Sequence, residues 1–252
     1  MHDSSMKRME WFVKTFVDTS REIKVLDIGS YDVNGSYREL FSDERFKYTG
    51  LDMTDGPNVD IVPEATYQWK EIENDAYDIT ISGQALEHIE FFWITMGEIV
   101  RTTAKDGLIC IIAPNGFKEH RYPVDCWRFF TDGMIALAKY YKLEIIHAHT
   151  NAAPSVEDQA WFSDSEADSM LVARKRYSGK PKVINLEEYQ CIPTDHEQVG
   201  KGMKSYEEHL ESVIEKEQKY TGDKEVNKSR TKRIISYAFK TVKKFRFRQD
   251  NV

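Results

Sequence analysis

The sequence has few cysteines and no long apolar segment, and each shortage narrows what the chain can be. Its three cysteines, Cys110, Cys126 and Cys191, are odd in number and far apart, a pattern that predicts neither a disulfide framework nor a zinc site. No run approaches the roughly eighteen apolar residues of a membrane-spanning helix. The N-terminal segment mixes charges into its apolar positions, unlike a signal peptide. We therefore expect a cytoplasmic protein.

Acidic residues outnumber basic residues in the chain before its C-terminal end. Residues 222–252 hold ten Lys/Arg against three acidic residues, a net of +7, whereas the preceding 221 residues hold 25 basic and 39 acidic residues, a net of −14. An acidic body argues against nucleic acid as its substrate. The basic end has apolar residues on one helical face. We expect it to contact the inner face of a membrane, to dock on the acidic body of its own or a second subunit, or to remain solvated.

The dinucleotide-binding fingerprint G-x-G-x-x-G is also missing. The run VLDIGSYDVNGS, residues 25–36, stands where such a motif would be. It predicts a buried strand that ends around Asp27 and Gly29, a loop that reaches Gly35, and a helix over 36–41. Glycines let the backbone approach a ligand, and the N-terminus of the helix faces it. The carboxylate before the turn suits a ligand with a cationic amine better than one with a pyrophosphate.

The order of apolar patterns predicts an α/β domain followed by a charged extension. Strands are expected at 22–28, 48–53, 59–62, 77–82, 108–113, 143–149 and 169–174. Helices are expected at 5–18, 64–73, 91–104, from the N-cap Thr131 onward, and in the extension at 204–220 and 228–248. Alternating strands and helices form a parallel sheet, but no helical pattern separates the last two strands, which must be antiparallel. We place the domain at 1–176 and the helical extension with its basic tail at 177–252.

One cluster of acidic residues could be interpreted as a metal site, but we do not expect it to bind a metal. Glu157, Asp158, Asp164 and Glu166 lie close together in the sequence, but no ligand spacing recurs among them. A solvated acidic loop accounts for these residues, and no metal site is predicted.

Two further segments complete a resemblance to a known family. Asp52 lies 25 residues after Asp27, where a βαβ unit places the acid that binds ribose hydroxyls, although a turn aspartate is the alternative. The segment DITISGQALEHI, residues 78–89, resembles the motif after the fourth strand of class I S-adenosylmethionine-dependent methyltransferases of the type 11 group. The chain departs from the family where Tyr31 and Val33 replace the second and third glycines of the loop, which is longer by about two residues.

The resemblance implies a fold, a cofactor and its contacts. The fold is a Rossmann-like, doubly wound, mostly parallel sheet of seven strands with an antiparallel last strand. The cofactor is S-adenosyl-L-methionine, which becomes S-adenosyl-L-homocysteine. The residues implied to bind it are Asp27, Gly29, Ser30, Gly35, Asp52, Met53, Gly83 and Gln84. Glu87 and His88 are implied to lie near the mouth of the substrate site.

Two histidines are candidates for the general base. Imidazole titrates near neutrality, so His88 or His120 could take a proton from an acceptor hydroxyl. A structural histidine is the alternative, because methyl transfer from a sulfonium often needs little beyond alignment.

The segment HRYPVDCWRFF, residues 120–130, is the candidate for substrate recognition. Arg121 and Arg128 supply donors for phosphate or carboxylate, and Asp125 can accept from hydroxyls. The residues able to stack on a sugar are Tyr122, Trp127 and Phe129. An ion-paired loop that packs its aromatics on the edge of the sheet is the alternative.

The segment also resembles a loop of methyltransferases encoded at bacterial surface-polysaccharide loci, which implies a small-molecule or glycan-precursor substrate. We therefore expect O-methylation of a sugar or phosphorylated precursor in capsule biosynthesis. The alternatives are a small-molecule N-methyltransferase and a catalytically silent methyltransferase-like subunit that binds a glycan-assembly partner.

Overall fold

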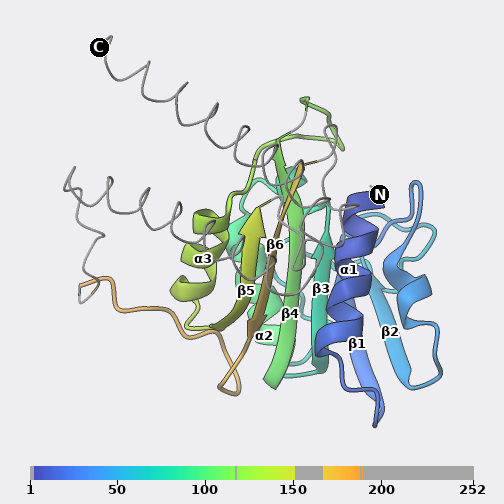
Figure 1. Ribbon diagram of the computed structural model, residues 1–252, viewed down its shortest axis with the longest axis horizontal. Coiled ribbons are helices and arrows are strands. Elements are labelled where there is room, and N and C mark those ends of the chain that lie inside the picture. The colour runs from blue at the N-terminus through green and yellow to red at the C-terminus, as the bar shows by residue number, and fades with distance from the viewer. Residues whose placement is uncertain (1–2, 117, 151–166, 188, 190–252) are drawn as a thin grey trace, which may run out of the picture. The chain divides into compact units, whose positions relative to one another are not determined.

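This computed structural model describes residues 3–116, 118–150, 167–187 and 189. These residues form one β-sheet with helices packed against it (Figure 1). Its strands are β1 (Ile23–Ile28), β2 (Phe46–Leu51), β3 (Tyr77–Gly83), β4 (Thr103–Gly116), β5 (Glu144–Thr150) and β6 (Ala167–Arg174). They lie in the order β2-β1-β3-β4-β6-β5. Pairs among β1 to β4 are parallel, and β6 is antiparallel to both β4 and β5. The predicted Rossmann-like, mostly parallel sheet with an antiparallel last strand is confirmed.

The central strand β4 explains why helices cover both faces of the sheet. Its run from Ile109 to Ala113 is fully buried, as expected for an uninterrupted apolar strand inside a parallel sheet. Successive side chains of a strand point to opposite faces. Ile109 and Ile111 pack with α2 (Phe92–Thr102) and α3 (Thr131–Tyr140). Cys110 and Ile112 pack on the other face with α1 (Asp3–Phe16) and the short 3-10 helix η1 (Tyr37–Phe41).

The predicted strand at 59–62 is wrong. Within the described residues the sheet has six strands, and Ile61 makes only an isolated parallel bridge to Leu51. The cause is the side chain of Asp60. Its carboxylate accepts a hydrogen bond from the backbone N–H of Gly50 at 2.7 Å, so a side chain takes the donor that a backbone carbonyl of a neighbouring strand would use.

The predicted helix at 64–73 is also wrong, because its backbone is bonded by side chains of α2. The guanidinium of Arg101 donates to the carbonyls of Trp69 and Ile72, at 2.7 and 2.8 Å. The carboxylate of Glu98 accepts from the backbone N–H of Trp69 at 2.8 Å. These groups replace the bonds that helical turns would supply, and they allow Trp69 and Ile72 to enter the core.

Two smaller differences concern helix starts. Residues 37–41 form a 3-10 helix, capped by the Ser36 hydroxyl, which accepts from the N–H of Arg38 at 3.0 Å. The N-cap of α3 is Phe130, not Thr131. The hydroxyl of Thr131 is hydrogen-bonded at 2.8 Å to that of Thr150 on β5 instead.

The expected helices at 204–220 and 228–248, and the basic tail with them, lie outside the described residues. Among the helices that are described, none has both the length and the apolar character needed to cross a membrane.

Candidate active site

The loops that carry the predicted site follow the carboxyl ends of neighbouring strands. Ile28 at the end of β1 pairs with Ser82 of β3, and Gly83 at the end of β3 pairs with Ile112 of β4. The loops after these strands therefore emerge side by side, at the edge where open α/β sheets bind ligands.

Asp27 is buried at the end of β1 and faces Tyr48 of β2. The Tyr48 hydroxyl donates a hydrogen bond to the Asp27 carboxylate. Burial raises the pKa of Asp27 to about 7, and the bond from Tyr48 opposes part of that rise. A carboxyl group in this state binds a proton or a cationic partner readily at neutral pH.

Gly29 meets two requirements that only glycine satisfies. Its φ is +77°, a conformation that L side chains rarely adopt. A Cβ at this position would lie 2.3 Å from the Cβ of Ala85 in the loop after β3. The glycine thus brings the loops after β1 and β3 into contact. Gly35 also has positive φ, at +122°, and its N–H donates to the Asp32 carboxylate at 2.7 Å. Next to Gly29, Ser30 is buried, and its hydroxyl has no hydrogen-bond partner.

Asp52 links the loop after β2 to the glycine loop. Its carboxylate accepts from the backbone N–H of Tyr31 at 3.1 Å and from that of Thr54 at 3.3 Å. The neighbouring Met53 is 60% exposed. Asp52 is thus held beside the glycine loop, and the exposed side chain of Met53 lies next to it in the sequence.

Gly83 and Gln84 lie against a buried polar network that the sequence analysis missed. A Cβ on Gly83 would lie 1.9 Å from the hydroxyl of Tyr37. The Gln84 side-chain amide donates to Asp168 of β6 at 2.9 Å. Asp168 also accepts from Ser4 of α1 at 2.5 Å and lies 3.6 Å from the guanidinium of Arg8, both side chains being fully buried. The available signal was Arg8, which shares the apolar face of residues 5–18 with Phe12.

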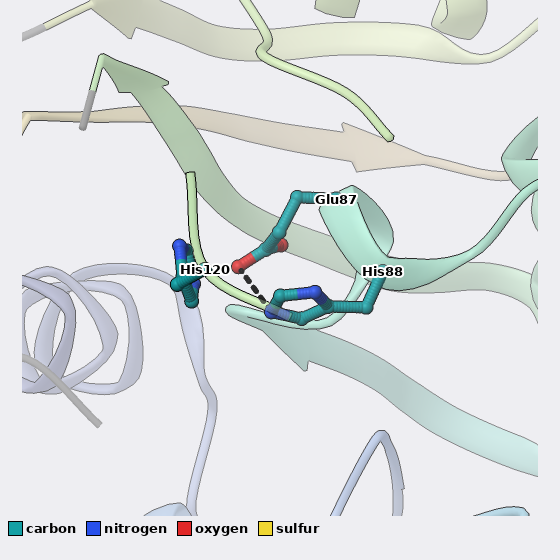
Figure 2. A group of neighbouring side chains, drawn as sticks. All are labelled: Glu87, His88 and His120. Atoms are coloured by element: carbon teal, nitrogen blue, oxygen red, sulfur yellow. Dashed lines mark ion pairs between the residues drawn. The ribbon is translucent and has the colours of Figure 1, made fainter. Parts of the chain in front are cut away.

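Glu87 and His88 lie in η2 (Leu86–His88), shortly after Gln84, and His120 from the loop after β4 lies beside them (Figure 2). The Glu87 side chain is fully buried, and neither carboxylate oxygen has a hydrogen-bond partner. Burial raises the pKa of Glu87 to about 8. His88 Nε2 lies 3.6 Å from Glu87 Oε1, and His88 Nδ1 lies 2.6 Å from the carbonyl oxygen of Val124. Since only an N–H can bond a carbonyl, Nδ1 carries the proton. Nε2 then faces Glu87 with its lone pair.

His120 reaches the same place from the loop after β4. Its ring is perpendicular to that of His88, with the centroids 4.9 Å apart. The backbone N–H of His120 donates to Asp125 at 2.7 Å. Arg128 holds Asp125 through two hydrogen bonds of 2.5 and 2.8 Å, and this guanidinium keeps the pKa of Asp125 well below its usual range. The two candidate bases therefore meet, and Asp125 and Arg128 bond each other and fix the loop that carries His120.

Among the remaining residues of the loop, some side chains are exposed to solvent and others pack against the protein. The side chain of Arg121 is 73% exposed and pairs with Glu119 at 2.9 Å, and Tyr122 is also exposed. The indole N–H of Trp127 donates to the carbonyls of Ile89 and Glu90. Phe129 is buried against Phe92 of α2, as in the packing alternative, so it is not placed to stack on a sugar.

No protein-family model matches the sequence, and no curated protein matches it. Solved structures do. A protein of Bacillus halodurans named as a methyltransferase aligns with a TM-score of 0.50 at 13% identity, over 69% of this chain and 100% of that one. The YcgJ protein of Bacillus subtilis aligns at 0.50 and 16%, over 70% and 100%. The 1,6-didemethyltoxoflavin-N1-methyltransferase of Burkholderia thailandensis, solved with its substrate and S-adenosylhomocysteine, aligns at 0.51 and 13%, over 69% and 79%. The chain therefore has the α/β Rossmann-like fold of methyltransferases.

Proposed function

We propose that this chain is an S-adenosylmethionine-dependent methyltransferase that methylates an oxygen of a small molecule. The observation that carries the proposal is the meeting of three loops at one edge of a methyltransferase-like sheet: the glycine loop after β1, Asp52 after β2 and the Gln84–His88 segment after β3. Fold alone does not decide function, but these loops bring groups that match the cofactor.

The residues present fit S-adenosylmethionine. Asp27 offers a buried carboxyl for the cationic amine, and Asp52 offers two oxygens for the ribose diol. The Ser30 hydroxyl is buried and has no hydrogen-bond partner, so it is available to form a hydrogen bond with a bound cofactor. When bound, the cofactor supplies an electrophilic methyl group on a sulfonium. Gly83 and Gln84 are proposed to lie along its methionine part.

The acceptor is proposed to lie between η2 and the loop after β4. His88, with its proton fixed on Nδ1, presents Nε2 as the acceptor of a proton from a hydroxyl group. Burial lowers the pKa of His88, which keeps the imidazole neutral at pH 7. His120 is the alternative base. Arg121, which is exposed, can bind an anionic group, and Tyr122 and Trp127 can line a sugar.

The finer proposal is O-methylation of a sugar or phosphorylated precursor of a bacterial capsule or other surface polysaccharide. It is supported by the arginine and aromatic side chains of the loop after β4 and by the resemblance of that loop. N-methylation of a small molecule and a silent subunit that binds a glycan-assembly partner are the alternatives.

Calorimetry with S-adenosylmethionine and S-adenosylhomocysteine tests the core of the proposal, and we expect both to bind with one site per chain. Transfer of a labelled methyl group to sugar phosphates and sugar nucleotides, with the matched neutral sugars as controls, tests the substrate class. A folded chain that binds neither ligand would contradict the proposal. Binding without transfer to any acceptor would favour the silent subunit.

A further inference from the structure

Three side chains that can ligate a metal ion converge on one point beside the proposed acceptor site. Glu87, His88 and His120 each offer one ligand atom, and these atoms all lie within 4.8 Å of one another (Figure 2). Two ligands held about 2.1 Å from one ion at the tetrahedral angle are about 3.4 Å apart. The observed 3.6 Å between His88 Nε2 and Glu87 Oε1 is close to that separation.

The carboxylate of Glu87 lacks the partners that other buried acids of the described chain have. Asp27 accepts from Tyr48, and Asp168 accepts from Ser4 and Gln84. Glu87 is equally buried, yet neither of its oxygens accepts a hydrogen bond. The nearby cation, Arg128, is bonded to Asp125. A buried carboxyl group without partners is neutral unless a cation or a metal lies beside it, and a cation shared with the two imidazoles would stabilise its ionised form.

Groups behind both histidines orient them as metal ligands are usually oriented. His88 donates from Nδ1 to the Val124 carbonyl, so Nε2 keeps the lone pair that faces Glu87. His120 Nδ1 lies 3.2 Å from the Lys118 carbonyl oxygen and 3.6 Å from Asp125, which Arg128 holds in place. A carbonyl or carboxylate behind the second ring nitrogen is the common arrangement around metal-bound histidine.

We propose that Glu87, His88 and His120 bind a divalent transition-metal ion that keeps at least one coordination position open. Two imidazoles with one carboxylate suit Zn²⁺, Fe²⁺, Co²⁺ or Mn²⁺ better than Mg²⁺ or Ca²⁺, which prefer oxygen ligands. The role of the ion rests on the proposed function: it would hold the acceptor oxygen and favour loss of its proton. His88 would then serve as a ligand, and not as the general base.

Zinc binding to the metal-free, full-length chain tests the site. The protein is freed of metal with a chelator and titrated with Zn²⁺ against a chromophoric chelator, and Co²⁺ is added separately to record its visible spectrum. We expect the variants Glu87→Gln, His88→Ala and His120→Ala each to weaken Zn²⁺ binding by at least about tenfold to a hundredfold. Removal of a group that only hydrogen-bonds to a metal ligand already lowers metal affinity by about that factor, so removal of a ligand should cost no less. Co²⁺ should show a tetrahedral or five-coordinate spectrum that each variant removes.

His147→Ala is the matched control, because it removes an imidazole that lies on β5, paired with His149. It should keep the affinity of the parent chain. Glu87→Gln conserves shape, and circular dichroism checks that each variant is folded. Zinc affinity that is absent, or that none of the three ligand variants lowers, would overturn the site. Zinc binding in a chain that binds no S-adenosylmethionine would refute the proposed function and leave the metal site standing.

Discussion

At the scale of single residues, the protonation state of Asp27 determines how the glycine loop meets its ligand. The carboxyl is buried and accepts from Tyr48, and its pKa is about 7 in the folded chain, against the ordinary value of 3.8 for an aspartate. The folded chain therefore binds more protons than the unfolded chain between these two values. The contribution of this group to the free energy of unfolding is fully present below about pH 3.8 and is lost as the pH rises through about 7.

Asp27→Asn should therefore stabilise the ligand-free chain more at pH 8 than at pH 5. The gain at pH 8 should be on the order of 2–4 kcal/mol, since a pKa difference of one unit corresponds to about 1.4 kcal/mol. Denaturant unfolding at the two pH values measures it. Asp55→Asn, which changes an exposed acid, is the control. An equal effect of Asp27→Asn at both pH values would show that the carboxyl is ionised throughout.

Asp52 is the residue on which ribose recognition is predicted to depend. Asp52→Ala should weaken S-adenosylhomocysteine binding by roughly 1–3 kcal/mol, as expected for the loss of hydrogen bonds to a charged group. Calorimetry measures the change. Asp55→Ala should leave the affinity unchanged. Because Asp52 also bonds the Tyr31 and Thr54 backbone, unfolding must be checked beside it. Unchanged affinity in a folded Asp52→Ala variant would place the ribose elsewhere.

At the scale of elements, the loop after β4 contains two arginines with different surroundings. Arg128 bonds Asp125, which receives the N–H of His120. Arg121 is exposed, and its guanidinium pairs with Glu119 at 2.9 Å. Both arginines were predicted to bind substrate, and the two environments separate their roles.

Arg128→Ala should lower kcat, because it releases Asp125 and thereby His120. Arg121→Ala should mainly raise KM for an anionic acceptor. Steady-state kinetics with the acceptor varied measures both, and affinity for S-adenosylhomocysteine should stay nearly constant in each variant. An equal loss of cofactor affinity and turnover in either variant would contradict the assignment of this loop to the substrate.

Strands that are buried on both faces of the sheet could be predicted from the sequence, because a continuous apolar run such as that of β4 is typical of them. The strand at 59–62 and the helix at 64–73 could not. There Asp60 and Arg101 bond the backbone through their side chains, and such contacts between distant residues leave no local pattern. Likewise, the sequence indicated the loops of the site, but the bonds between Gln84, Asp168 and Arg8 join segments more than seventy residues apart.

At the scale of the whole molecule, the charge of the chain is divided between its two parts. A chain truncated before Gly222 loses a segment of +7 and keeps one of −14. It should remain folded and bind S-adenosylhomocysteine, because all six strands of the described chain end by Arg174. Thermal unfolding and calorimetry test this. Aggregation or loss of binding would show that the extension covers the core and that the boundary at 176 is misplaced.

The full-length chain and the truncated chain together distinguish the partners proposed for the tail. If the tail binds membranes, only the full-length chain should sediment with anionic vesicles, and salt should release it. If it docks on protein, truncation should change the oligomeric mass measured by light scattering. If neither measurement differs between the two chains, both proposals fail.

The buried pair of Arg8 and Asp168 also bears on how the chain is made. Arg8 lies in the first helix and its counter-ion in the last strand of the sheet. At translation rates of roughly 5–20 residues per second, Asp168 is synthesised about 8–30 s after Arg8. Burying a guanidinium before its counter-ion is present is strongly unfavourable, so we expect α1 to pack stably on the sheet only after β6 has been synthesised. Gln84 is held by the same aspartate. The loop that precedes Glu87 and His88 should thus become ordered only after β6 has been synthesised, which delays ligand capture by the nascent chain until the sheet is complete.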